Sequence, residues 1–137
     1  MEKHFELNDS EFELQFGNCT LNPELFTHEA HLRLAWIHIK NQGIEKAIAA
    51  IRQQIQKYAA SLGANDKYHE TITVASIKAV SFFISKSTEI SFHDFITKYP
   101  QLKTDFKKLL STHYSTDIFS SETAKKDFIE PDLDPFE

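Results

Sequence analysis

The spacing of apolar residues in the middle of the chain is the feature that most constrains its fold. In the segment 44–62, large apolar side chains recur every three or four residues, at Ile44, Ile48, Ile51, Ile55 and Tyr58. This spacing places one apolar stripe along one face of an α-helix. Gly43 and Gly63 flank the segment, and glycine commonly ends helices. We therefore predict a helix over 44–62.

Helix signals recur on both sides of this segment. Thr27 can cap a helix over 28–42 that stops at Gly43, and Asn22 before Pro23 indicates a shorter helix start. A third long helix is predicted over 68–85. Shorter helices are expected after residue 87, over 91–98, over 100–110, and from Ser120 or Ser121 to Ile129. The fold class predicted is all-α, a compact bundle of about five to six helices.

The two ends of the chain differ from its middle in their residue pattern. Apolar and polar residues nearly alternate over 5–16, which is strand periodicity, so we expect an extended N-terminal arm over 1–21. The tail, 131–137, contains two prolines, which disfavour a helix. It acts either as a strap over its own core or as a docking peptide. We predict a single domain over 1–137, with its helical core over 22–130.

Composition excludes several classes of protein. The net charge of −5 disfavours binding to nucleic acid, which normally needs a basic face. No apolar run approaches the ~20 residues that a membrane span requires. Cys19 is the single cysteine and cannot form an internal disulfide. These features favour a cytoplasmic protein; they do not define its oligomeric state.

Three histidines stand near the starts of two predicted helices. On a helical projection of 28–42, His28 and His31 lie on or beside the apolar stripe, whereas Glu29, Arg33 and Lys40 point elsewhere. His69 lies near the apolar line of the helix over 68–85. The short connections at Gly43 and 63–67 make successive helices antiparallel, so the first and third long helices run parallel. The three imidazoles would then meet at one end of the core.

This constellation predicts a metal site formed by His28, His31 and His69. Zinc is often held by three imidazoles and non-haem iron by mixed histidine and carboxylate ligands, so one zinc or iron ion is the expected cofactor. Glu29 and Glu70 are the candidate catalytic residues, as ligands or general bases.

Tyr68 and Trp36 flank the predicted pocket as candidate contacts to a small-molecule ligand, with core or rim packing as the alternative. Two other readings of the histidines stay open. Helix N-termini and neutral imidazoles also suit a small anionic ligand, and the histidines could simply satisfy backbone groups in a protein-interaction module. Whether the chain is an enzyme is left open by the sequence.

The segment Phe26-Thr27-His28-Glu29-Ala30-His31-Leu32-Arg33-Leu34-Ala35-Trp36, followed downstream by Tyr68-His69-Glu70-Thr71, resembles a family of small, uncharacterised bacterial helical proteins. Members carry a His-x-x-His-Leu…Ala-Trp segment and then a Tyr-His-x-Thr segment. The resemblance covers roughly the middle half of the chain. It implies a bacterial origin and brings no assigned activity.

Overall fold

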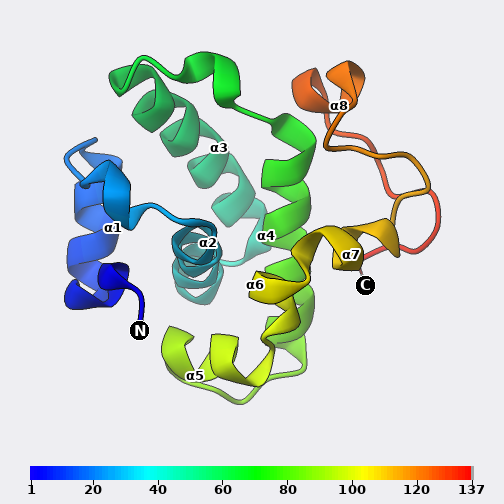
Figure 1. The fold of residues 1–137 in the computed structure, drawn as a ribbon. Helices are drawn as coiled ribbons and strands as arrows, with labels where there is room; N and C mark the ends of the chain where they lie inside the picture. Colours follow the sequence, from blue (N-terminus) through cyan, green and yellow to red (C-terminus); the bar gives the residue numbers. More distant parts are fainter. Residues whose placement is uncertain (137) are drawn as a thin grey trace. The chain divides into compact units, whose positions relative to one another are not determined.

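A computed structural model describes residues 1–136, which contain helices and no β-strand. The all-α class is therefore confirmed (Figure 1). The chain divides into two compact units, Met1–Tyr68 and His69–Glu137, and Glu137 itself lies outside the described residues. The prediction of a single domain stays a prediction. Within residues 1–136, no helix combines the length and the apolar character that crossing a lipid bilayer requires.

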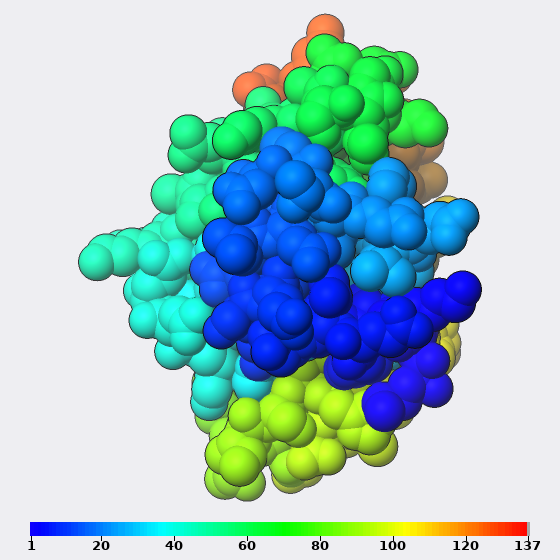
Figure 2. Space-filling model, turned by 90° about the vertical axis from the view of Figure 1, so that its left-hand side faces the viewer, coloured from blue at the N-terminus to red at the C-terminus, as the bar shows by residue number. Residues whose placement is uncertain are grey.

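The first unit begins with a helical N-terminus. Its elements are the 3-10 helix η1 (Lys3–Glu6), α1 (Asp9–Gly17), the 3-10 helix η2 (Pro23–Leu25), α2 (His28–Gln42), α3 (Ile44–Ser61) and the 3-10 helix η3 (Asn65–Lys67). Helices α1, α2 and α3 pack against one another. In Figure 2 the N-terminal segment and α1, both drawn in blue, occupy adjoining parts of one face of this unit.

Helix α1 replaces the extended arm that the alternating pattern predicted. Asn8 accepts a hydrogen bond from the backbone N–H of Glu11, and the Glu11 side chain accepts one from the backbone N–H of Asn8. This reciprocal capping box starts a helix. Phe12 and Phe16, four residues apart, are then both fully buried, while Leu14 between them is exposed. The extended arm predicted from this alternation was wrong, because Leu14 does not lie on the buried face of α1 with Phe12 and Phe16.

Local signals set the bounds of α2 and α3. The Thr27 side chain accepts a hydrogen bond from the backbone N–H of Ala30, which caps α2 as predicted. Gly43 ends α2 with a φ of 85°, in the left-handed region that glycine adopts without a steric penalty. Part of the predicted stripe of α3 is buried, at Ile51 and Tyr58. The Tyr58 hydroxyl donates a hydrogen bond of 2.8 Å to the carbonyl of Leu21, which fastens the chain before α2 onto α3.

The second unit contains one long helix and several short ones. They are α4 (Glu70–Ser85), α5 (Phe92–Lys98), α6 (Gln101–Thr104), α7 (Phe106–Ser111) and α8 (Glu122–Lys126). The helix predicted over 100–110 is divided, because Asp105 leaves the helical conformation between α6 and α7. The last predicted helix is shorter than expected and ends at Lys126. Helix α8 packs against α4.

The C-terminal tail is a strap on its own unit. The ring of Phe136 stacks on His113 at a centroid distance of 4.1 Å and is 8% exposed. The backbone N–H of Leu133 donates to the carbonyl of His113 at 3.0 Å. Asp132 accepts hydrogen bonds from the backbone and the hydroxyl of Ser115. Of the two roles considered for the tail, the contacts therefore favour the strap.

Replacing Phe136 by alanine is expected to lower the free energy of unfolding by about 3 kcal/mol, because a buried ring and its stacking contact are lost. Leu133 is 58% exposed, so Leu133→Ala is the matched control and is expected to change the stability by less than about 0.5 kcal/mol. Urea denaturation followed by circular dichroism measures both. Equal stabilities of the two variants would show that the tail does not act as a strap.

Candidate functional site

Of the three predicted metal ligands, His28 and His31 lie at the start of α2 in the first unit, and His69 lies in the second unit. The proposed metal site and the parallel pairing of their helices draw on both units and stay predictions. The inward orientation expected for His28 and His31 stays a prediction: both residues have a large exposed fraction, yet burial lowers the pKa of His31 to about 4. The His31 ring stacks on Phe26 at a centroid distance of 3.9 Å.

Two charged residues of α2 are buried, although the helical projection placed them on an outer face of the helix. Glu29 is 5% exposed and Arg33 is 3% exposed. The projection was wrong for them because the buried face of α2 extends nearly around the helix, from Leu32 through His38. The N-terminal segment supplies the polar partners that buried charges require.

His69 is the N-cap of α4, rather than a residue within the helix. Its Nδ1 accepts a hydrogen bond of 3.1 Å from the backbone N–H of Ile72, so its Nε2 carries the proton and donates to the carbonyl of Ile118 at 2.8 Å. Both ring nitrogens are thus engaged with backbone groups of the second unit. This is the capping role that the alternative interpretation gave to a histidine near a helix start.

The other predicted residues are largely buried. Glu70 begins α4 and is 7% exposed, and Trp36 is 5% exposed within α2. Tyr68 is half-buried after η3. The burial of Trp36 fits the core packing considered as its alternative. The catalytic roles of Glu29 and Glu70, and the ligand contacts of Tyr68 and Trp36, stay predictions.

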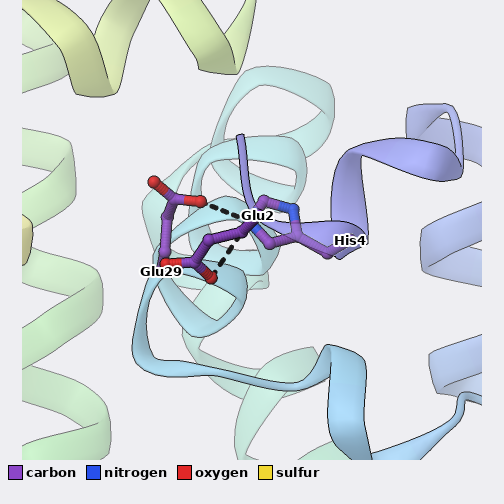
Figure 3. Close-up of side chains that lie close together, drawn as sticks. All are labelled: Glu2, His4 and Glu29. Atoms are coloured by element: carbon purple, nitrogen blue, oxygen red, sulfur yellow. Dashed lines mark hydrogen bonds and ion pairs between the residues drawn. The ribbon is translucent and has the colours of Figure 1, made fainter.

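Glu2, His4 and Glu29 form the group with metal-binding potential among residues 1–136. The candidate ligand atoms of the three side chains all lie within 4.8 Å of one another. His4 is fully buried, and its Nε2 lies 2.5 Å from Oε2 of Glu29 and 3.8 Å from Oε1 of Glu2. Figure 3 shows the two carboxylates converging on the imidazole, with His4 on η1 and Glu29 on α2. The hydroxyl of Thr27 also donates a hydrogen bond to Oε1 of Glu2.

Arg33 holds this cluster from the other side of the imidazole. Its Nη1 donates to the carbonyl of His4 at 2.7 Å and lies 3.3 Å from Nδ1 of the same residue. Its Nη2 donates to the carbonyl of Leu7 at 2.8 Å and to Asp9 at 2.9 Å. A guanidinium can only donate, so Nδ1 of His4 is the acceptor and Nε2 carries the proton that is shared with Glu29.

The electrostatics of the cluster favour a neutral imidazole. Burial lowers the pKa of His4 below its usual value, and the positive charge of Arg33 lowers it as well. The two carboxylates act in the opposite direction and raise the pKa of this ring, Glu29 more than Glu2. Because burial has the largest effect, the ring is neutral near pH 7 and is able to act as a ligand.

Sequence reasoning missed His4, because its partner Glu29 is 25 residues away along the chain. The signal that was available is the capping box of Asn8 and Glu11. It predicts a helix after residue 8 and therefore a folded rather than extended N-terminal segment. Nothing in the local pattern indicates which face of α2 that segment covers.

Comparisons of the chain with protein-family models, with curated proteins and with solved structures find no match.

The cap of α4 is open to a direct test. Replacing His69 by alanine removes the acceptor for the backbone N–H of Ile72 and is expected to cost about 1 kcal/mol of stability. His69→Asn restores a good capping acceptor and is expected to recover much of this loss. Urea denaturation at pH 7.5 measures both, and an alanine variant as stable as the wild type would contradict the capping role.

The same contact predicts a loss of stability in acid. Burial lowers the pKa of His69, and Lys125 lowers it further against the opposing effect of the Ile118 carbonyl. Below about pH 6.5 the His69 side chain binds a proton in the unfolded chain but not in the folded one. The contribution of His69 to the free energy of unfolding is therefore fully present above pH 6.5. It is lost as the pH falls through the pKa of folded His69.

In denaturation at pH 7.5 and pH 5.5, His69→Asn should therefore lose less stability on acidification than the wild type. Some dependence on pH should remain, because burial lowers the pKa of His4 and of His38 as well. His93→Gln, at an exposed position, is the matched control and should behave as the wild type does. A pH dependence that is identical in all three proteins would exclude His69 as a source.

Proposed function

We propose that this protein binds a divalent transition metal ion through Glu2, His4 and Glu29. The observation that carries the proposal is the convergence of one buried imidazole and two carboxylates within 4.8 Å. Sets of histidine and carboxylate ligands suit iron and manganese, and zinc also accepts them. Three protein ligands leave at least one coordination position for water or a substrate.

Charge supports a cation at this place. The two carboxylates carry two negative charges, whereas the imidazole is neutral and Arg33 forms an ion pair with Asp9. An ion on Nε2 of His4 would replace the proton that now lies between this nitrogen and Glu29. Both carboxylates would then face the two positive charges of the ion instead of one shared proton.

Binding requires small shifts of the side chains. Two ligands about 2.1 Å from an ion lie about 3.0 to 3.4 Å apart in octahedral or tetrahedral geometry. Glu29, at 2.5 Å from Nε2, must therefore move outward, and Glu2, at 3.8 Å, must move inward. Glu2 has room to do so because its side chain is 26% exposed.

Arg33 sets the cost of this rearrangement. With an ion on Nε2, the neutral ring carries its proton on Nδ1, which then cannot accept from Nη1 of Arg33. The guanidinium must give up the 3.3 Å contact and keep the stronger 2.7 Å bond to the carbonyl of His4. The opposing charge of Arg33 favours an ion that is bound reversibly.

Two expectations from the sequence are part of this proposal: a small anionic ligand and a cytoplasmic location. The ligand of the bound ion would be a small, anionic molecule, because the open position lies on a metal. A single cysteine and a net charge of −5 favour a cytoplasmic protein that does not bind nucleic acid.

The test is metal binding by protein that carries no affinity tag, stripped with a chelator and titrated with Zn²⁺, Fe²⁺ or Mn²⁺. Glu2→Gln removes a ligand at a partly exposed position, and we expect it to weaken binding at this site by about tenfold or more. Glu6→Gln, at an exposed position on the short helix η1 that follows Glu2, is the matched control and should bind as the wild type does. Calorimetry and the shift in melting temperature report the binding.

Identical isotherms for Glu2→Gln and Glu6→Gln would exclude the metal site. So would less than about a tenth of an equivalent of ion retained after buffer exchange, together with no thermal shift. The cluster would then be an ion network that fastens the N-terminal segment to α2.

A further inference from the structure

A cavity of about 210 Å³ lies in the second unit, where α7 and the loop that follows it form its walls. The apolar part of its lining consists of Leu110, Tyr114, Ile118 and Phe119. An apolar cavity of about 150 Å³ is large enough to hold benzene. The cavity therefore has room for one aromatic ring and a short polar group.

The loop that forms one wall of the cavity is held in place from distant parts of the second unit. Nε2 of His69 donates a hydrogen bond of 2.8 Å to the carbonyl of Ile118. The carboxylate of Asp132, in the tail, accepts one of 3.0 Å from the backbone N–H of Ser115. These bonds fix the wall before a ligand arrives, and a largely preformed cavity is typical of sites for small molecules.

The lining contains one cationic side chain, that of Lys107 on α7. Its Nζ lies 5.4 Å from the centroid of the Phe119 ring, an arrangement that attracts the ammonium to the face of the ring. Among residues 1–136, no carboxylate forms an ion pair with this ammonium. Its charge is therefore free to meet an anionic group on a ligand.

The acidic and phenolic groups of the lining already have partners. The two carboxylate oxygens of Asp117 accept hydrogen bonds of 3.0 Å, one from the backbone N–H of Phe119 and one from the hydroxyl of Ser120. The hydroxyl of Tyr114 donates to the carbonyl of Ile129 at 2.7 Å. Burial raises the pKa of Tyr114 to about 12, so this hydroxyl keeps its proton at neutral pH.

We propose that this cavity binds a small aromatic monocarboxylate, with its ring against Tyr114 and Phe119 and its carboxylate on Nζ of Lys107. Aromatic rings attract one another beyond the area that they bury, which favours a ring over an aliphatic chain. One carboxylate matches the one ammonium, whereas the charges of Asp117 and Asp132 repel a second negative charge. The site lies in the second unit and does not depend on the metal cluster proposed in the first.

The test is a titration of the full chain with phenylacetate, followed through the NMR signals of the backbone amides. We expect changes concentrated in residues 107–119 and a Kd of about 1 mM, as for other ligands of this size. Phenylacetamide has the same shape without the charge and should bind about fivefold more weakly. Acetate has no ring and should leave these signals unchanged.

A pair of lysine variants separates the charge from the cavity. Lys107→Met removes the ammonium and keeps the length of the side chain, and Lys108→Met, at the next exposed position of α7 and outside the lining, is the matched control. We expect Lys107→Met to weaken the binding of phenylacetate about fivefold and to leave that of phenylacetamide unchanged. Lys108→Met should bind both as the wild type does. Both lysines are exposed, so neither substitution should affect folding.

Three results would overturn the proposal. The first is equal affinity of the wild type for phenylacetate and phenylacetamide, and the second is equal affinity of Lys107→Met and Lys108→Met for phenylacetate. The third is the absence of any change at residues 107–119 up to about 20 mM phenylacetate, far above the expected Kd. A response confined to these residues and weakened by Lys107→Met alone supports the proposal, whether or not the first unit binds metal.

Discussion

A guanidinium ion buried as deeply as that of Arg33 needs partners for its donors, and the N-terminal segment supplies them. The carbonyls of His4 and Leu7 and the carboxylate of Asp9 accept its hydrogen bonds. The rings of Phe5 and Phe12 lie against its faces, with centroids 5.3 and 4.9 Å from its central carbon. These contacts place His4 over Glu29. Arg33 therefore helps to hold η1 and the start of α1 on α2, where the candidate metal cluster forms.

Three buried or half-buried imidazoles differ in what their nitrogens contact, and this decides what each can do. His69 uses both nitrogens on backbone groups, which is a structural role. His4 shares a proton with a carboxylate and faces a cation on the other side. His38 has the amide of Gln42 at its Nδ1, and its Nε2 lies 3.9 Å from the carboxylate of Glu13. The sequence shows three histidines in helices or at their starts and cannot distinguish these surroundings.

The parts of the fold that could be predicted are those with signals close together in the chain. Helix α2 has the predicted bounds because Thr27 and Gly43 act on their own neighbours. Helix α1 was missed because the alternation through Leu14 resembles a strand, although the capping box at Asn8 was present. Which side of α2 is buried could not be predicted, since it depends on a segment more than twenty residues away. The candidate site was therefore sought around His28 and His31 at the start of α2. The buried cluster instead contains Glu29, which lies on the face of α2 that the N-terminal segment covers.

The dependence of the N-terminal segment on α2 has a consequence during synthesis. A ribosome releases residues 1–17 before it has made the helices that cover them, because chains emerge from the N-terminus. Until α2 and α3 have formed, Phe12 and Phe16 have no core to enter, and Arg33 and Glu29 are then still hydrated. Residues 1–17 are made before α2 and α3 and are thus among the last parts of the first unit to reach their final contacts. In that interval the aromatic side chains of residues 1–17 are the ones that a chaperone would bind.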